Sequence, residues 1–197
     1  MKNAGGQRGF LMGDLARIAV FAALIAVLGA PGSFNVFGNP VPITLQTLGV
    51  MLAGAVLGSW RAALAVVVLL GLVAAGLPLL AGGRGGVGVF TAPSAGFLIG
   101  WIPAAAVTGL LVERAGRTPS LLRLLVACVV GGIGVVYLIG VPVQALITGL
   151  PLTEAMRLSA VFLPGDLVKA VVAALVARGT QRAYPDAVPA VHNERVR

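Results

Sequence analysis

Charged residues are scarce in this sequence. Only 10% of its 197 residues are Asp, Glu, Lys or Arg, while 58% are hydrophobic. Soluble domains are about a quarter charged, and so few charges could not hydrate the surface of a soluble fold. The shortage of charge therefore excludes an ordinary soluble domain and predicts an integral membrane protein. The 28 glycines agree with this prediction, because small residues allow helices to pack closely in lipid.

The residues that most enzymes and cofactor sites need are also nearly absent. The single cysteine, Cys128, excludes an internal disulfide, and the single histidine, His192, excludes a histidine metal cluster. Neither of the two lysines follows a glycine, so the chain has no nucleotide-hydrolysing P-loop. No carboxylate pair or nucleophile–histidine arrangement is visible. We therefore predict that the chain is not an enzyme and binds no cofactor, and that any pumping uses a partner's energy or an existing gradient.

Apolar runs make up most of the chain. Each run approaches the ~20 residues that a helix needs to cross a bilayer, and no alternation typical of membrane strands appears. We therefore predict an all-α integral membrane protein with six transmembrane helices. Pro31 directly follows the small residues Gly29 and Ala30, so we expect the first run to be retained as a span rather than cleaved as a signal peptide. The predicted spans are about 15–31, 43–59, 62–80, 94–112, 121–140 and 161–177.

This division predicts three parts. Residues 1–14 form a cytoplasmic N-terminal segment, residues 15–178 the six-helix membrane domain, and residues 179–197 a disordered cytoplasmic tail. The outer connections at about 32–42, 81–93 and 141–160 are rich in Gly and Pro and poor in charge, which is typical of loops that fold over a pocket.

The basic residues predict the orientation. The net charge is +8, but there is no basic stripe or aromatic platform of the kind that binds nucleic acid, so we expect no nucleic-acid partner. With the N-terminus placed inside, eleven Lys and Arg residues fall on the inner side, and only Arg84 and Arg157 on the outer side. This bias follows the positive-inside rule. Both termini are therefore expected in the cytoplasm, and the chain in the cytoplasmic membrane.

A few polar residues interrupt the apolar runs. FLPGDLVKA, residues 162–170, places Asp166 and Lys169 on one helix face in the outer third of the last span. Pro164 and Asp166 suit the start of a helix, but a lysine there opposes the helix dipole. Because a charge inside the bilayer costs about 2.5–3.5 kcal/mol on insertion scales, we interpret the pair as a polar ligand site that opens outward.

Other polar and aromatic residues lie at the same outer level. Thr44 and Gln46 begin the second span, and a buried Gln amide needs hydrogen-bond partners. Tyr137, near the outer end of the fifth span, is either an interfacial residue or a ligand-stacking one. Arg84 either meets a ligand carboxylate or is simply solvated.

Small residues recur at four-residue spacing on several spans. This pattern favours packing within the bundle, and the alternative is a docking face for another membrane protein. The pairs are Ala19/Ala23, Ala22/Ala26, Gly54/Gly58 and Gly96/Gly100.

Five stretches, in this order, resemble the BioY family of biotin transporters. BioY proteins are the substrate-capture (S) components of energy-coupling factor (ECF) transporters. The stretches are VPITLQTLGVMLAGAVLG (41–58), GLVAAGLPLLAGG (71–83), PSAGFLIGW (93–101), VVYLIGV (135–141) and FLPGDLVKA (162–170). One difference is APSAGF at 92–97, where related families often read GPTGGY, so that Phe97 lacks a hydroxyl.

The resemblance implies a function and a site. It implies high-affinity capture of biotin from the outer side by an S-component-type bundle. It also implies partners, namely a transmembrane coupling (T) protein and two ABC ATPases that consume ATP. The family's polar residues fall on Asp166, Lys169, Gln46 and Tyr137, and its docking surface on Ala19, Ala22, Ala23 and Ala26. Our hypothesis adds Thr44 as a hydrogen-bonding residue and Arg84 as the partner of the ligand carboxylate.

Other functions are less consistent with these motifs. An S component for another vitamin would not need TLQ and PGDxxK together. A gradient-driven carrier would use Asp166 as a proton site, and a membrane scaffold would bind no ligand. A membrane enzyme is the least consistent, because the catalytic sets are missing.

Overall fold

The described part of the chain is helical. The computed structural model describes residues 5–32, 39–116 and 119–184, with side chains from Met12 onward. Within these residues there is no named strand, and one isolated bridge joins Leu80 and Arg84. The elements are α1 (Gly5–Val27), α2 (Gln46–Leu57), α3 (Ser59–Ala74), the 3₁₀ helix η1 (Val87–Phe90), α4 (Ala95–Arg114), α5 (Leu121–Ala127), the π-helix η2 (Cys128–Val135), α6 (Val136–Thr148), α7 (Leu152–Ala160) and α8 (Leu163–Ala183).

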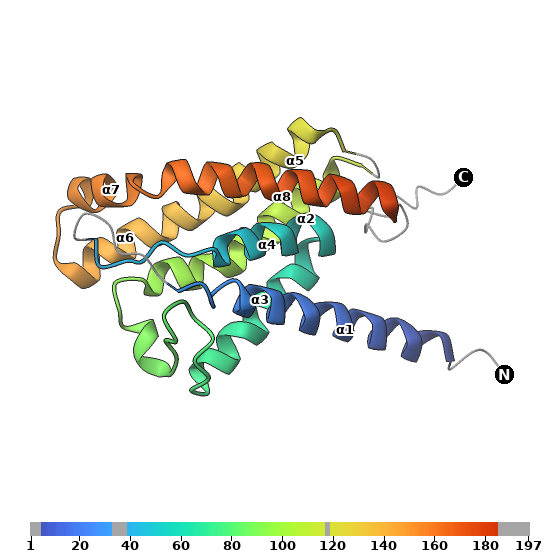
Figure 1. Cartoon of the computed structure of the whole chain (residues 1–197), viewed down its shortest axis with the longest axis horizontal. Helices are drawn as coiled ribbons and strands as arrows, with labels where there is room; N and C mark the ends of the chain where they lie inside the picture. The colour runs from blue at the N-terminus through green and yellow to red at the C-terminus, as the bar shows by residue number, and fades with distance from the viewer. Residues whose placement is uncertain (1–4, 33–38, 117–118, 185–197) are drawn as a thin grey trace.

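The helices form a bundle around α4. Helix α4 packs against α2, α3 and α6, and α2 also packs against α8 (Figure 1). The first turns of α1 and the last turns of α8 lie at the same end of the molecule, and the turn between α6 and α7 lies at the opposite end (Figure 1). The prediction that the chain is all-α is therefore confirmed for the described residues.

Among the described residues, fewer helices are long and apolar enough to span a membrane than the sequence predicts. By length and composition, Ala95–Arg114 and the continuous segment Leu121–Thr148 could each cross a membrane. The pair α7 and α8, bent by 55°, adds a third span if it counts as one. Helices α2 and α3 are apolar but only 12 and 16 residues long, and α1 carries charges such as Asp14 and Arg17.

Several predicted boundaries differ from the structure. The predicted outer loop 141–160 is wrong, since it contains the second half of α6 and all of α7. Helix α8 continues to Ala183, past the predicted end of the last span at 177 and into the predicted tail that begins at 179. Residues 1–4 and 185–197 lie outside the described residues. Helix α6 ends at Thr148, and the positive φ of 69° at the next residue, Gly149, permits a tight turn into α7. Pro164 lies in the first turn of α8, where a missing N–H costs nothing.

Close contacts at two glycines confirm that small residues allow the helices of the bundle to pack tightly against one another. A Cβ on Gly54 would lie 2.6 Å from Cβ of Thr108, on α4, and a Cβ on Gly96 would collide with Val143, on α6. The alanines of α1 are divided. Ala22 is buried in the core and Ala26 is half-buried, whereas Ala19 and Ala23 are exposed.

Candidate functional site

One cavity collects all six polar or aromatic residues that the sequence predicts as ligand contacts. It lies toward the end of the bundle that carries the α6–α7 turn, and it has a volume of about 50 Å³. Its walls come from the segment before α2, from α2, α4, α6 and α8, and from the loop that carries Arg84. The six residues are Thr44, Gln46, Arg84, Tyr137, Asp166 and Lys169.

A buried ion pair forms the polar floor of this cavity. Nζ of Lys169 lies 2.9 Å from Oδ1 of Asp166, and both side chains are more than nine-tenths buried. The two residues are one turn apart near the start of α8, as the i, i+3 spacing predicts. Either charge alone would be costly to bury in an apolar interior. Each of the two groups neutralises the other, and this pairing makes their burial tolerable.

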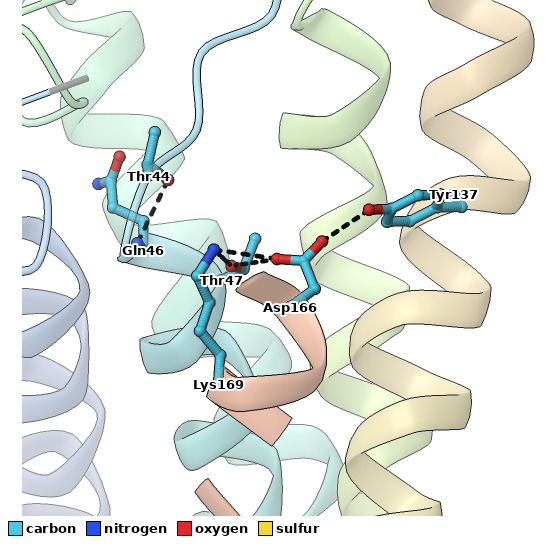
Figure 2. A network of polar contacts seen from close by, with 6 residues as sticks. All are labelled: Thr44, Gln46, Thr47, Tyr137, Asp166 and Lys169. Carbon is cyan, nitrogen blue, oxygen red and sulfur yellow. Dashed lines mark hydrogen bonds and ion pairs between the residues drawn. The ribbon is translucent and has the colours of Figure 1, made fainter. Parts of the chain in front are cut away.

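Two further side chains complete the cluster. Thr47, on α2, accepts a 3.1 Å hydrogen bond from Lys169 and donates one of 3.4 Å to Asp166 Oδ1. Tyr137, on α6, donates a 2.7 Å hydrogen bond to Asp166 Oδ2. Figure 2 shows these contacts converging on one carboxylate from three helices. The cluster therefore presents an oriented carboxylate and an oriented ammonium group at the base of a largely apolar cavity.

Arg84 provides a second cationic group at the wall of the cavity. Its Nε donates to the carbonyl of Ala81 at 3.2 Å, and its Nη1 donates to Oγ of Ser94 at 3.1 Å. Both acceptors are neutral, and no carboxylate among the described residues forms an ion pair with Arg84. Burial lowers the pKa of the Arg84 guanidinium. A half-buried cation without a counter-ion is suited to an anionic ligand group.

Gln46 lines the cavity, but its amide is turned away from the ion pair (Figure 2). Nε2 donates to the carbonyls of Ile25 and Leu79, and Oε1 accepts from the backbone N–H of Ala81. Three of its four hydrogen-bonding positions are therefore occupied by backbone groups, and one lone pair on Oε1 remains for a ligand.

Aromatic rings form the apolar walls. Phe97 stacks edge-on against Tyr137, with ring centroids 6.1 Å apart, and against Phe162 at 6.3 Å. Trp101 also lines the cavity and is buried, and its Nε1 has no hydrogen-bond partner among the described residues. Phe97, Trp101 and Phe162 thus give the cavity an apolar wall beside Tyr137.

Comparison with known proteins agrees with this geometry. A family model described as the BioY family matches residues 1–186. The chain belongs to the BioY family. It is 52% identical over 183 residues to the biotin transporter BioY of Rhodobacter capsulatus, covering 87% of this chain and 94% of that protein. It is 50% identical over 164 residues to the probable biotin transporter BioY of Bacillus subtilis, covering 83% and 88%.

A solved structure supports the same assignment. The fold matches the crystal structure of the S-component for biotin from an ECF-type ABC transporter with a TM-score of 0.84 and 29% sequence identity, covering 92% of this chain and 95% of that one. The resemblance read from the sequence is thus confirmed. The BioY relatives are transporters, which confirms that the chain is not an enzyme, and the family identifies it as a membrane protein.

Thr47, Phe97 and Trp101 also line the cavity, although the sequence did not place them among the predicted ligand contacts. Thr47 directly follows Gln46 in the ITLQT stretch, and its i, i+1 position gave no indication that it faces α8. Phe97 and Trp101 lie on one face of α4, at i and i+4, and this spacing was the available signal that both could reach one cavity.

Proposed function

We propose that this chain captures biotin on the outer side of the cytoplasmic membrane and delivers it inward as the S component of an ECF-type ABC transporter. The observation that carries the proposal is the buried Asp166–Lys169 pair at the base of the cavity, in a chain that belongs to the BioY family. The named relatives are a biotin transporter and a probable biotin transporter, and the matched structure is an S-component for biotin.

The chemistry of the cavity matches the chemistry of biotin. Biotin has a ureido ring with two N–H donors and one carbonyl, an apolar thioether ring, and a carboxylate on a flexible tail. Asp166 accepts from the ureido N–H groups and Lys169 donates to a ligand oxygen, while Thr44 and the free lone pair of Gln46 add hydrogen bonds.

The rest of the ligand would meet the other walls. The ring of Tyr137 packs against the apolar part of biotin, and Arg84 binds the carboxylate. A site of this kind discriminates strongly, because an analogue that lacks a ureido N–H leaves buried groups of the protein unpaired.

Binding requires the walls of the cavity to move. The volume of about 50 Å³ is well below the ~300–1,000 Å³ of typical ligand pockets. Most of the lining outside regular helices is wall segment 41–44, and the other lining residues outside helices are Arg84, Ser94 and Phe162. We therefore expect wall segment 41–44 to shift outward as biotin enters and to close over it.

The membrane arrangement follows from the same proposal. Six helical segments cross the membrane, α1, α2, α3, α4, α5 to α6, and α7 to α8, and both termini are cytoplasmic. The first turns of α1 and the last turns of α8 lie at the same end of the molecule, and this arrangement supports the topology (Figure 1). Short spans such as α2 would then require tilt or local thinning of the bilayer.

The partners are a transmembrane coupling protein and two ABC ATPases, and ATP is used by those partners and not by this chain. The exposed Ala19 and Ala23 offer a smooth surface on α1 for the coupling protein, and Ala26 lies at the edge of that surface. Ala22 is buried in the core, so it supports the packing of α1 and does not itself meet a partner.

Uptake of labelled biotin tests the proposal. Cells that express the chain together with a coupling protein and its two ATPases should accumulate biotin. Depletion of ATP should stop this accumulation. An uncoupler should not stop it as long as the ATP level is maintained. A gradient-driven carrier that uses Asp166 as its proton site gives the opposite pattern. Competition by unlabelled vitamins separates a biotin protein from an S component for another vitamin.

A further inference from the structure

The side chain of Gln46 connects three separate parts of the backbone. It is 1% exposed. Nε2 donates to the carbonyl of Ile25 at 3.2 Å and to that of Leu79 at 3.1 Å, and Oε1 accepts from Ala81 N–H at 3.0 Å. Both amide hydrogens are used in this way. One amide therefore joins the start of α2 to the end of α1 and to the loop after α3.

The end of α1 provides a fixed point for this amide. The carbonyl of Ile25 lies in the last turn of α1, where carbonyls lack partners within the helix. The N–H of Gly29 bonds to the carbonyl of Ala26 instead. A Cβ on Gly29 would lie 3.0 Å from Cδ and Nε2 of Gln46, so the absence of a side chain lets the amide approach α1 closely.

The loop on the other side of the amide holds Arg84. Ala81 donates its N–H to Gln46, and its carbonyl accepts from Nε of Arg84 at 3.2 Å. The same loop is closed by two backbone hydrogen bonds between Leu80 and Arg84, of 3.0 and 3.3 Å. Gln46, Ala81 and Arg84 therefore form a continuous chain of hydrogen bonds from the end of α1 to the cavity.

We propose that Gln46 is a positioning residue for Arg84. Gln46 acts through Ala81 and is itself anchored to α1. The inference rests on the proposed function, because Arg84 is there the partner of the biotin carboxylate. A guanidinium fixed in place before the ligand arrives loses less freedom on binding than one on an unrestrained loop. Removal of the Gln46 amide should therefore lower the affinity for a ligand that has the carboxylate further than the affinity for a neutral analogue, because the hydrogen bond of Oε1 to the ureido ring is lost for both.

Affinities for biotin and for biotin methyl ester, which lacks the anionic carboxylate, separate these effects. Wild-type protein in detergent should prefer biotin by at least about tenfold, the size expected for a hydrogen bond to a charged group. Arg84→Ala should abolish this preference, and Gln46→Met should reduce it to about threefold or less. The matched control is Gln181→Met. Gln181 is also a buried glutamine bonded to a backbone carbonyl, that of Ala55, but it does not line the cavity, so the preference should be unchanged.

The outcomes are distinguishable. If Gln46 only stabilises the fold, Gln46→Met lowers the affinity for both compounds equally. This result overturns the inference, while the proposed function stands. A wild-type preference that survives Arg84→Ala overturns the inference as well. If folded wild-type protein binds neither compound, the proposed function itself fails. If Gln46→Met does not fold, Gly29→Ala displaces the same amide more gently and should lower the preference in the same direction.

Discussion

Tyr137, on α6, donates a 2.7 Å hydrogen bond to Oδ2 of Asp166, on α8. The other oxygen of the same carboxylate accepts from Lys169 and Thr47. Oδ2 keeps one further lone pair, so the arrangement fixes the orientation of Asp166 and still leaves it able to accept from a ligand. The carboxylate is thus oriented before a ligand binds.

Replacement of Tyr137 by Phe tests the value of this contact. The change removes one hydrogen bond to a charged group, which is worth about 1.5–3 kcal/mol, so biotin affinity should fall by roughly ten- to a hundredfold. Equilibrium binding measures the effect. The matched control is Tyr184→Phe, because Tyr184 is exposed beyond the end of α8 and its hydroxyl should have no effect. Unchanged affinity in Tyr137→Phe would show that Asp166 is held without this bond.

The buried ion pair predicts an asymmetric effect on stability. Lys169→Met leaves Asp166 as an uncompensated buried charge, and loss of one partner of such a pair costs about 3–5 kcal/mol. The double variant Asp166→Asn/Lys169→Met removes both charges and should recover much of that loss. Thermal unfolding in detergent measures both. A double variant as unstable as the sum of the two single variants would contradict the account.

A second buried network anchors the wall segment that precedes α2. Asn39 donates to the carbonyl of Leu158 at 2.9 Å and accepts from Gln144 at 3.1 Å, and Ser159 donates to Gln144 at 3.1 Å. Ser159→Ala leaves an acceptor of Gln144 unsatisfied, which should cost about 1–3 kcal/mol of stability. It should also loosen the attachment of Asn39, so that biotin dissociates faster.

Dissociation kinetics and thermal unfolding check this prediction. Ser120→Ala is the control, because Ser120 is an exposed N-cap of α5 that lies far along the chain from the network. Loss of that cap should cost about 0.5–2 kcal/mol without a change in the dissociation rate. An equal effect of both variants on dissociation would show that the network does not hold the wall.

Two helical glycines should respond in opposite ways to alanine. A Cβ on Gly109, on α4, would collide with the backbone of Gly58 and Ser59, and backbone cannot move aside easily. Gly109→Ala should therefore destabilise the protein by about 1–3 kcal/mol. A Cβ on Gly71, on α3, would have no neighbouring atom within 4 Å, so Gly71→Ala should be neutral or stabilising by up to about 1 kcal/mol. Thermal unfolding of both variants measures the difference, and similar changes in stability would contradict the packing between α4 and the α2–α3 turn.

The sequence predicted the residues of the cavity better than the helices that carry them. Asp166 and Lys169 could be found because charges are rare in apolar runs and their i, i+3 spacing fixes a common face. The backbone contacts of Gln46 could not be predicted. Its partners are the carbonyl of Ile25 and the N–H of Ala81, and nearly every residue has such groups. Hydropathy also did not reveal the bend between α7 and α8, since both sides of it are compatible with helix.

Equilibrium binding of labelled biotin to the detergent-purified chain tests the central claim most directly, with Asp166→Asn and Lys169→Met measured beside the wild type. The account predicts tight binding by the wild type and its loss in both variants, while each variant remains folded by its elution on gel filtration. Binding by folded wild type that is unaffected by both substitutions would contradict the assignment of the site. No binding by folded wild type would contradict the biotin function itself.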